Sequence, residues 1–419
     1  METREIRGQE CWLIENESVS LALTRLGGMM APVRFTLPDG RQVEPYYVSP
    51  WQEEGLEIDE PVLVPLRGDF FCAPFGAGST YEGVDYVSHG PAATGMWGDA
   101  EVSENPSAGG VRDAARSNDP GPSPSPRAGD NTAGVSEKAG PGSGGTPPAV
   151  ELRTSMDSGA PLGSITKSIT LREGHTAVYQ RHTLRDVQVS LPLGHHATLA
   201  ADPAAPLLIS TSPVRFGMVD TDNAPVYVNE EYRSLEAGAR FEQPEAVPTV
   251  WRREAQSDCT VFPAREGFVD IIQVVAEPRE GEPAWVTAAC PERGYLWYSL
   301  KDSKVLPSTV FWMENRGRHG APWNGRNCCI GLEDVCAAFA GGMAASNGAN
   351  PLAEAGVATV VSPDAKGQIS VSYIEGVIGI PSDFGRAEAV EFGDEGIRVV
   401  GENGAHVSTN LDWRYALRR

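Results

Sequence analysis

Histidines are few in this sequence, and His89 is the first that could serve a binding site. It lies in the segment SHGPAATGMWGD, a short distance before Trp97. An imidazole can hydrogen-bond a hydroxyl group, and an indole can cover the apolar face of a sugar ring. The segment is therefore a candidate binding element. A turn histidine beside a core tryptophan is the alternative interpretation.

The adjacent residues His195 and His196 lie in LPLGHHATLA, which is typical of a strand. Neighbouring side chains of a strand point to opposite faces, so we expect at most one of the two to face a given pocket. For the same reason the two should not hold a metal ion together. The remaining histidines have no distinctive surroundings and are expected to be structural or exposed: His175, His182, His319 and His406.

The long segment 309–335 carries a third candidate element. Trp312 and Trp323 flank a polar loop, and Glu333 follows the apolar run 328–332, which we expect to be a strand. A carboxylate at the end of such a strand costs free energy to bury unless it is paired or functional. The alternative is an exposed turn formed by Glu333 and Asp334.

Arg67 and Asp69 form a fourth element, in the segment LRGDFFCAPFG. These two charged residues precede an aromatic run, so they could contact a ligand or could form an ion pair that caps a strand. The sequence contains no P-loop, no GxGxxG dinucleotide fingerprint, no HExxH and no GxSxG motif.

The seven cysteines do not indicate a disulfide framework or a metal site. Their number is odd and they are scattered over a long chain. Cys328, Cys329 and Cys336 cluster, but no CxxC pair accompanies them, so we expect no zinc and no other metal. Reduced thiols of a cytoplasmic protein are the interpretation that we adopt.

Many short, regularly spaced strands and almost no amphipathic helix predict an antiparallel β-sandwich or barrel. A turn at 38–41 (PDGR) should close a hairpin, and 335–345 is the one expected helix, weakened by its two glycines. Strands are expected at 11–14, 19–24, 33–37, 164–171, 177–184, 207–210, 268–275, 284–289, 296–300, 305–312, 358–361, 369–373, 387–392 and 397–400, with a last one near Trp413.

The composition changes abruptly between about residues 103 and 148. This stretch is rich in Gly, Pro, Ser and Ala and contains no Leu, Ile, Phe, Tyr or Trp. Such a segment cannot bury enough apolar area to offset its ordering entropy. We interpret it as a disordered insertion in a single domain that spans 1–419, and a linker between two domains is the alternative.

The total charge narrows the class of partner. The 419 residues carry a formal net charge of -22, which disfavours binding to nucleic acid and to anionic membrane surfaces. The polar N-terminus has no signal-peptide pattern, and no apolar run is long enough to cross a membrane. We therefore expect a cytoplasmic protein.

The order of these elements resembles the aldose 1-epimerase (galactose mutarotase) superfamily. Gly27 and Gly28 precede a strand and turn, as in the family's opening hairpin. His89-Gly90 with Trp97 resembles its His-Gly…Trp element, and the strands 164–171 and 177–184 resemble its central hairpin. GHHATL (194–199) is similar to the stretch with the second histidine, and GLED (331–334) to the strand with the catalytic glutamate. The resemblance covers nearly the whole chain except the insertion.

The resemblance implies a β-supersandwich and isomerase chemistry at the anomeric carbon of a free sugar. Glu333 would be the base that takes the proton of the C1 hydroxyl, and His196 the acid that protonates the ring oxygen on the other side of the sugar. His89 and Arg67 would bind hydroxyls, and Trp97, Trp312 or Trp323 would hold the sugar face. No cofactor is implied. Three further residues complete the expected substrate-binding set: Asp69, His195 and Asn324.

Two departures from the family pattern leave alternatives open. His195 and Leu199 stand where the family has an asparagine and an aromatic residue, and Asp334-Val335 follow the glutamate in place of Gln or Pro. A carbohydrate-binding protein without turnover, using the same groove, is therefore the alternative to an enzyme. An accessory domain and a plain interaction protein are weaker alternatives.

Overall fold

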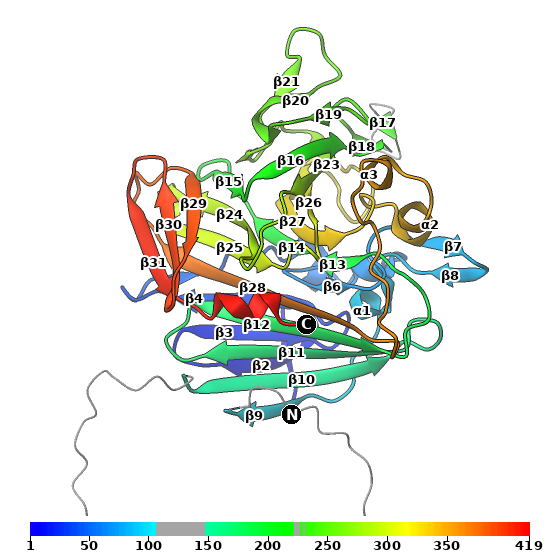
Figure 1. Cartoon of the computed structure of the whole chain (residues 1–419), viewed down its shortest axis with the longest axis vertical. Coiled ribbons are helices and arrows are strands. Elements are labelled where there is room, and N and C mark those ends of the chain that lie inside the picture. The colour runs from blue at the N-terminus through cyan, green and yellow to red at the C-terminus, as the bar shows by residue number, and fades with distance from the viewer. Residues whose placement is uncertain (106–146, 222–226, 229–230) are drawn as a thin grey trace, which may run out of the picture.

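The computed structural model describes residues 1–105, 147–221, 227–228 and 231–419, and its main body consists of large antiparallel sheets (Figure 1). One sheet has nine strands in the order β22, β15, β24, β25, β28, β12, β11, β10 and β9. Their bounds, in that order, are Val261–Phe262, Leu207–Thr211, Ala284–Cys290, Tyr295–Lys301, Ile369–Gly379, Ala177–Arg185, Ser164–Arg172, Ala149–Asp157 and Glu101–Glu104.

A second sheet of eight strands carries the candidate site. Seven strands follow the order β19, β16, β23, β26, β27, β13 and β6, and β14 pairs with β27 beside them. Their bounds, with β14 last, are Arg240–Phe241, Val214–Val219, Phe268–Ala276, Ser308–Asn315, Cys328–Cys336, Leu193–His195, Phe71–Cys72 and Ala197–Ala200.

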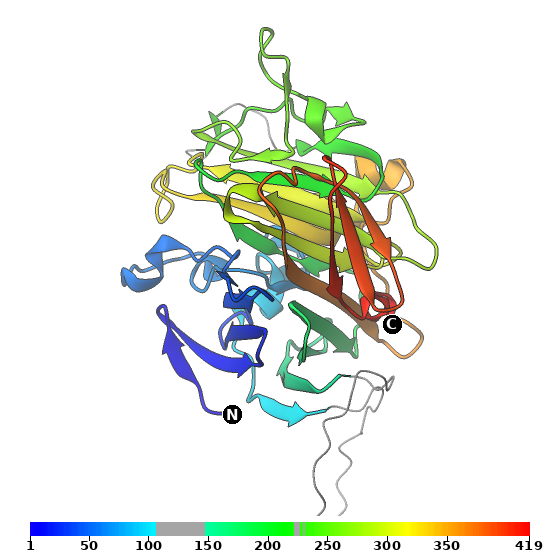
Figure 2. The same ribbon diagram turned by 90° about the vertical axis from the view of Figure 1, so that its left-hand side faces the viewer.

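Smaller sheets accompany these two. The N-terminal sheet runs in the order β1 to β5, at Arg4–Ile6, Gln9–Glu15, Val19–Thr24, Met30–Thr36 and Gln42–Val43. The C-terminal sheet comprises β29 (Ala387–Phe392), β30 (Gly396–Gly401) and β31 (His406–Asn410), shown in red across the yellow and green strands in Figure 2. Short hairpins are formed by β7 (Ser79–Tyr81) with β8 (Val84–Tyr86), β17 (Tyr227–Val228) with β18 (Glu231–Tyr232), and β20 (Val247–Pro248) with β21 (Gln256–Ser257).

Helices are short in the described part of the chain. The α-helices are α1 (Gly90–Thr94), α2 (Gly342–Asn347) and α3 (Pro351–Glu354). The 3-10 helices are η1 (Pro50–Glu53), η2 (Pro61–Leu63), η4 (Pro244–Ala246), η5 (Pro291–Arg293) and η6 (Trp413–Leu417). None of these described helices is long and apolar enough to cross a membrane.

The main apolar core lies between the large sheets. Leu152 and Ile169 of the nine-stranded sheet and Phe311 and Leu332 of the eight-stranded sheet belong to one buried cluster. Because successive side chains alternate between faces, the same strands send their other residues to the opposite face of each sheet. That second face is also covered: the C-terminal sheet and η6 pack, with Trp413 among others, on the nine-stranded sheet.

The antiparallel β-sandwich predicted from the sequence is confirmed, with most expected strands within a residue or two of their places. The expected helix at 335–345 is wrong in its first part, because β27 continues to Cys336 and α2 starts only at Gly342, whose φ is +71°. The last segment is the 3-10 helix η6 and not a strand. At 358–361 only Val361 forms a bridge, to Leu191.

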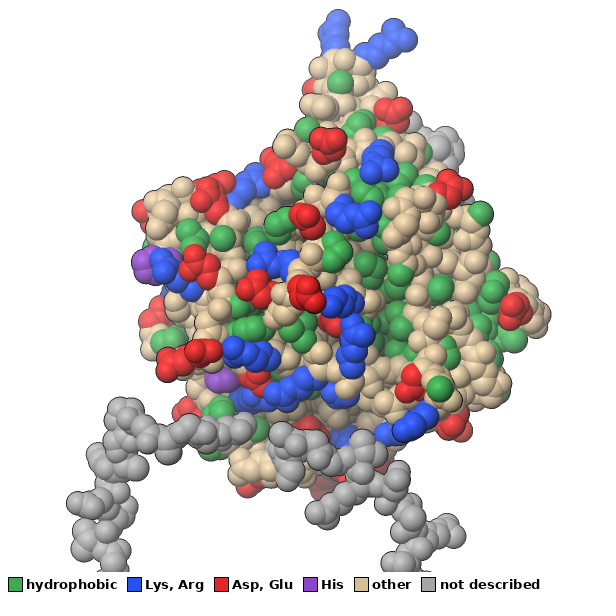
Figure 3. All heavy atoms as spheres, viewed as in Figure 1, with side chains coloured by type: hydrophobic (Ala, Val, Ile, Leu, Met, Phe, Trp, Pro, Cys, Tyr) green, Lys and Arg blue, Asp and Glu red, His purple; other side chains and the backbone are tan. Residues whose placement is uncertain are grey.

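The predicted insertion falls mainly on residues 106–146, which lie outside the described residues. The two strands that enclose it are β9 and β10, and these pair antiparallel with Val150 opposite Glu104. Figure 3 shows Lys and Arg side chains interspersed with Asp and Glu on one face of the molecule, so the net negative charge does not make that face uniformly acidic.

Candidate functional site

Strand alternation places three of the predicted residues on the outer face of the eight-stranded sheet. On β27, Leu332 belongs to the core, so Glu333 points to the other face. On β26, Phe311 belongs to the same core and Trp312 to the apolar cluster on the outer face. His196 lies between β13 and β14 and lines the same cavity as these residues.

The expectation that Glu333 ends its strand is wrong. Glu333 lies inside β27, opposite Val310 of β26, and the strand continues to Cys336. The strand can continue because the next carboxylate, Asp334, is buried on the core side in an ion pair with Lys301 at 2.5 Å. A charged residue is tolerated inside a sheet when it is paired in this way.

His196 and Glu333 form a buried pair at the centre of the candidate site. The His196 Nε2 lies 3.2 Å from Oε1 of Glu333, and the two residues are 6% and 3% exposed. The other ring nitrogen of His196 lies 3.1 Å from the Thr198 hydroxyl, and the ring of Phe70 stacks on the imidazole at 4.4 Å. The imidazole is therefore held from two sides, with Nε2 directed to the carboxyl group.

His89 lies next to this pair. It precedes helix α1 in a left-handed conformation with φ of 56°, and its ring centroid is 5.2 Å from that of His196. Its Nδ1 is 3.3 Å from the Cys72 sulfur, and its ring packs nearly perpendicular to that of Phe75. A left-handed backbone at a residue other than glycine is uncommon, and such strain is typical of functional positions.

Burial sets the protonation of these three groups. It lowers the pKa of His89 to about 4 and that of His196 well below the ordinary imidazole value, and neighbouring cationic groups act in the same direction. It raises the pKa of Glu333 well above the ordinary value, an effect that the charge of Arg318 opposes. Burial therefore favours the uncharged form of each of the three groups.

The pair opens into a cavity of about 320 Å³. Trp312 and Trp323 form part of its wall, with ring centroids 5.7 Å apart, and Trp51 packs edge-on against Trp323 at 4.9 Å. Two aromatic rings beside an acid–base pair give a surface for the C–H face of a pyranose and groups that can move a proton.

Five of the predicted site residues do not line this cavity. The Arg67 guanidinium donates to the carbonyl oxygens of Ile6 and Arg7, so it supports the N-terminal strands. Asp69 lies on the core side, where it contacts the Nδ1 of His195 at 3.0 Å and accepts a hydrogen bond from Gln180.

His195 stacks on Tyr373 at 3.9 Å, which fits the expectation that only one of the two adjacent histidines faces a pocket. Trp97 is buried beside Gly28 and donates its indole N–H to the carbonyl of Ala92. Asn324 lies in the loop between β26 and β27, and its amide donates to the carbonyl of Pro322.

Sequence reasoning missed several residues that the cavity contains. Phe70 belongs to the LRGDFF segment, and alternation from Asp69 could have identified it as the residue that faces the opposite side. Arg318 lies in the polar loop after Trp312, and Glu231 reaches the cavity from β18. No local motif links Glu231 to the other residues, because its contact depends on long-range pairing.

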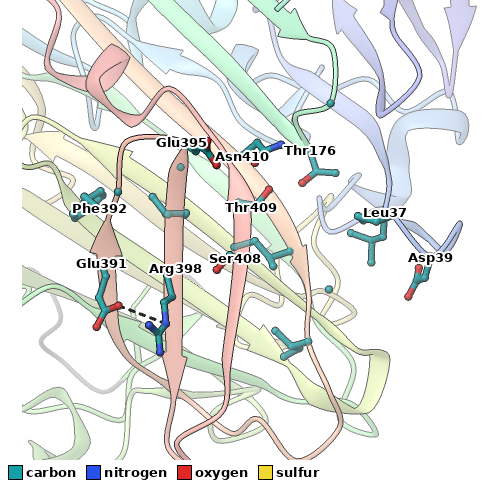
Figure 4. Close-up of a pocket in the computed structure, with 18 of the residues that line it drawn as sticks. Leu37, Asp39, Thr176, Glu391, Phe392, Glu395, Arg398, Ser408, Thr409 and Asn410 are labelled. Atoms are coloured by element: carbon teal, nitrogen blue, oxygen red, sulfur yellow. Dashed lines mark ion pairs between the residues drawn. The ribbon is translucent and has the colours of Figure 1, made fainter. Parts of the chain in front are cut away.

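A second hollow lies elsewhere, between the C-terminal sheet and the end of β28 (Figure 4). Its volume is larger, about 1110 Å³, and its wall includes Glu391 and Arg398, which form an ion pair at 3.6 Å. None of the predicted site residues lines it. Within the described ranges, no group of three or more His, Cys, Asp or Glu residues could hold a metal ion.

The fold is similar to solved structures of aldose epimerase type. A structure from Klebsiella pneumoniae, described as a candidate aldose 1-epimerase, matches with a TM-score of 0.55 and 10% identity over 89% of this chain and 80% of that chain. A candidate aldose 1-epimerase from Escherichia coli K12 matches with a TM-score of 0.49 and 11% identity, over 89% and 100% of the two chains. A GalM/aldose epimerase homologue from C. elegans gives 0.48 and 11%, over 89% and 99%.

No family model matches the sequence, and no curated protein matches it. Identity near 10% carries no information on activity, so the match to the Klebsiella structure bears on the fold alone. The sheet order and this match lead to one conclusion: the chain has the galactose-mutarotase-like fold.

Proposed function

We propose that this protein is an aldose 1-epimerase-like isomerase that interconverts the anomers of a free sugar. The observation that carries the proposal is the buried His196–Glu333 contact of 3.2 Å in a cavity walled by Trp312 and Trp323. His89 lines the same cavity, so three residues that are far apart in the sequence can act on one ligand. The seven cysteines, all of them free, support a reducing, cytoplasmic setting.

The geometry suits the two oxygens that must exchange a proton. The C1 hydroxyl oxygen and the ring oxygen are bonded to the same carbon, so an acid and a base that lie side by side can reach both. The sequence-based scheme had the two groups on opposite sides of the sugar, whereas His196 and Glu333 are direct neighbours. A sugar seated on the tryptophans with C1 toward the pair would present both oxygens to it.

The proton balance of the reaction fits a pair that carries one proton. When the single proton of the pair moves from Glu333 to His196, the pair is in its ionic form. Glu333 then takes the proton of the C1 hydroxyl, the C1–O bond to the ring oxygen breaks, and His196 gives its proton to that oxygen. The sugar is then an open-chain aldehyde, and the pair consists of a neutral carboxyl group and a neutral imidazole. After rotation about the C1–C2 bond the reverse steps close the ring on the other face, and the ionic form returns.

Polarimetry on a panel of freshly dissolved aldoses tests this proposal. We expect the approach to the anomeric equilibrium to become faster in proportion to protein concentration for at least one neutral hexose or pentose. If no aldose in the panel equilibrates faster than in buffer, the proposed isomerase activity is wrong. Binding without acceleration would favour the non-catalytic carbohydrate-binding alternative.

The rate should show a broad pH plateau around neutrality. Activity requires one proton on the pair, so it falls when a second proton is added and when the last proton is lost. Because burial lowers the pKa of His196, we expect the acid limb below the ordinary imidazole range. Because burial raises the pKa of Glu333, the alkaline limb should lie well above the ordinary carboxyl range.

Initial rates of polarimetric change between pH 4 and pH 10, corrected for the buffer-catalysed reaction, measure this profile. A single acid limb centred on the ordinary carboxyl range would contradict a proton shared between Glu333 and His196.

A further inference from the structure

Arg318 is the one cationic side chain among the described residues that line the cavity. Its guanidinium carbon lies 5.2 Å from the ring centroid of Trp312 and 4.8 Å from that of Trp323. His89, His196 and Glu333 line the same cavity, and the charge of Arg318 acts on all three. Arg318 therefore lies where a ligand on the tryptophans would meet it.

Two acidic residues fix the position of Arg318. The Oε1 of Glu231 lies 2.8 Å from its Nε, and the second oxygen of that carboxylate lies 2.6 Å from the Arg233 guanidinium. The backbone contributes as well, because Glu231 and Arg318 form an antiparallel bridge. Glu314, buried beneath the loop, accepts a hydrogen bond from the backbone N–H of Arg318 at 3.3 Å.

This arrangement leaves the outer part of the guanidinium available. Among the described residues, no acceptor takes a hydrogen bond from either terminal nitrogen of Arg318, while its guanidinium carbon lies over both indole rings. Two parallel N–H donors on a fixed plane match two neighbouring oxygen acceptors, such as the vicinal hydroxyls of a sugar or the oxygens of an anion.

The charges at the cavity favour the hydroxyls. Glu231 pairs with Arg318 and also with Arg233, which does not line the cavity. Glu60 lines the cavity as a second carboxylate. An anionic ligand would therefore enter a cavity lined by two carboxylates and by one cation that is already in an ion pair. An uncharged ligand can use the donors of Arg318 without breaking the ion pair and without this repulsion.

We propose that Arg318 binds a pair of hydroxyls of an uncharged aldose, and that Glu231 makes the site discriminate against sugar phosphates. This inference rests on the proposed function, because it assigns the substrate class of the same cavity. Glu231 is then a specificity-determining residue that acts through Arg318.

Tryptophan fluorescence provides a binding readout that needs no turnover, since Trp312 and Trp323 line the cavity. We expect glucose or galactose to bind the wild-type protein at least about tenfold more tightly than its 6-phosphate, because like charges brought together lose affinity. Glu231→Gln should reduce this preference by about tenfold, since it removes one of the repelling carboxylates. Arg318→Gln should weaken binding of the uncharged sugar.

Glu282→Gln is the matched control, because Glu282 forms an exposed ion pair with Arg279 outside the cavity. It should leave the preference unchanged. Equal or tighter binding of the 6-phosphate by the wild-type protein would overturn the inference, and this result does not depend on how any variant folds. An unchanged preference in folded Glu231→Gln, checked by circular dichroism, would overturn the role of Glu231.

The polarimetric assay separates this inference from the proposed function. Faster anomer equilibration of sugar phosphates than of free sugars would overturn the inference but would still support the proposed isomerase activity. Preferred binding of free sugars without faster anomer equilibration would support the inference and contradict the proposed isomerase activity.

Discussion

Replacing Glu333 by glutamine is expected to slow enzyme-dependent anomer equilibration by about 100- to 10,000-fold, the range that one general base contributes. Glutamine keeps the shape of the side chain but cannot take a proton from the C1 hydroxyl. The loss should appear in the turnover number, while sugar binding, followed by tryptophan fluorescence, persists. Polarimetry at saturating sugar measures the effect.

Glu391→Gln is a matched control for this experiment. Glu391 is a surface carboxylate that lines the second hollow and pairs with Arg398. Its replacement should leave the rate at the wild-type level. A folded Glu333→Gln protein that retains full activity would show that another group removes the proton.

The largest effect on stability is expected from Lys301→Met. Lys301 and Asp334 are 1% and 0% exposed at their side chains and lie 2.5 Å apart in the core. Asp334 also accepts hydrogen bonds from Ser299, Thr309 and Tyr373, so it belongs to a connected network. Removing the cation leaves a buried charge without its partner, which should lower the free energy of unfolding by about 3–5 kcal/mol.

Urea denaturation of the wild type and the variant measures this difference. Arg398→Met, at the exposed Glu391–Arg398 pair, is the control, and it should change the free energy of unfolding by less than about 1 kcal/mol. Because Asp334 follows Glu333 on β27, Lys301→Met should also lower activity by loosening that strand. A loss of stability no larger than the control's would mean that the network contributes little.

The alternation of side chains explains what could be predicted of this molecule. The apolar patterns of β3 and β29 predict those strands without tertiary information. The alternation of side chains predicts that His195 and His196 point to opposite faces, as their different partners show. That rule also separates Glu333 from Asp334 once the strand is known to continue past them.

Long-range contacts explain what could not be predicted. Arg67 and Asp69 have the charges of ligand-binding residues, but their partners are backbone carbonyls near Ile6 and the side chain of His195, which are distant in sequence. The ion pair of Glu231 with Arg318 likewise joins two segments that no motif connects. Such pairings depend on the three-dimensional arrangement of the sheets. Local composition does not predict that arrangement.

Magnetisation transfer between the two anomeric C1 signals of a ¹³C-labelled aldose tests the central claim most directly, because it observes exchange at equilibrium. We predict exchange with the wild-type protein on a time scale at which the sugar alone and the sugar with Glu333→Gln show none. The absence of exchange with the wild type, for a sugar that fluorescence shows to be bound, would contradict the claim that the His196–Glu333 pair moves a proton between the two oxygens.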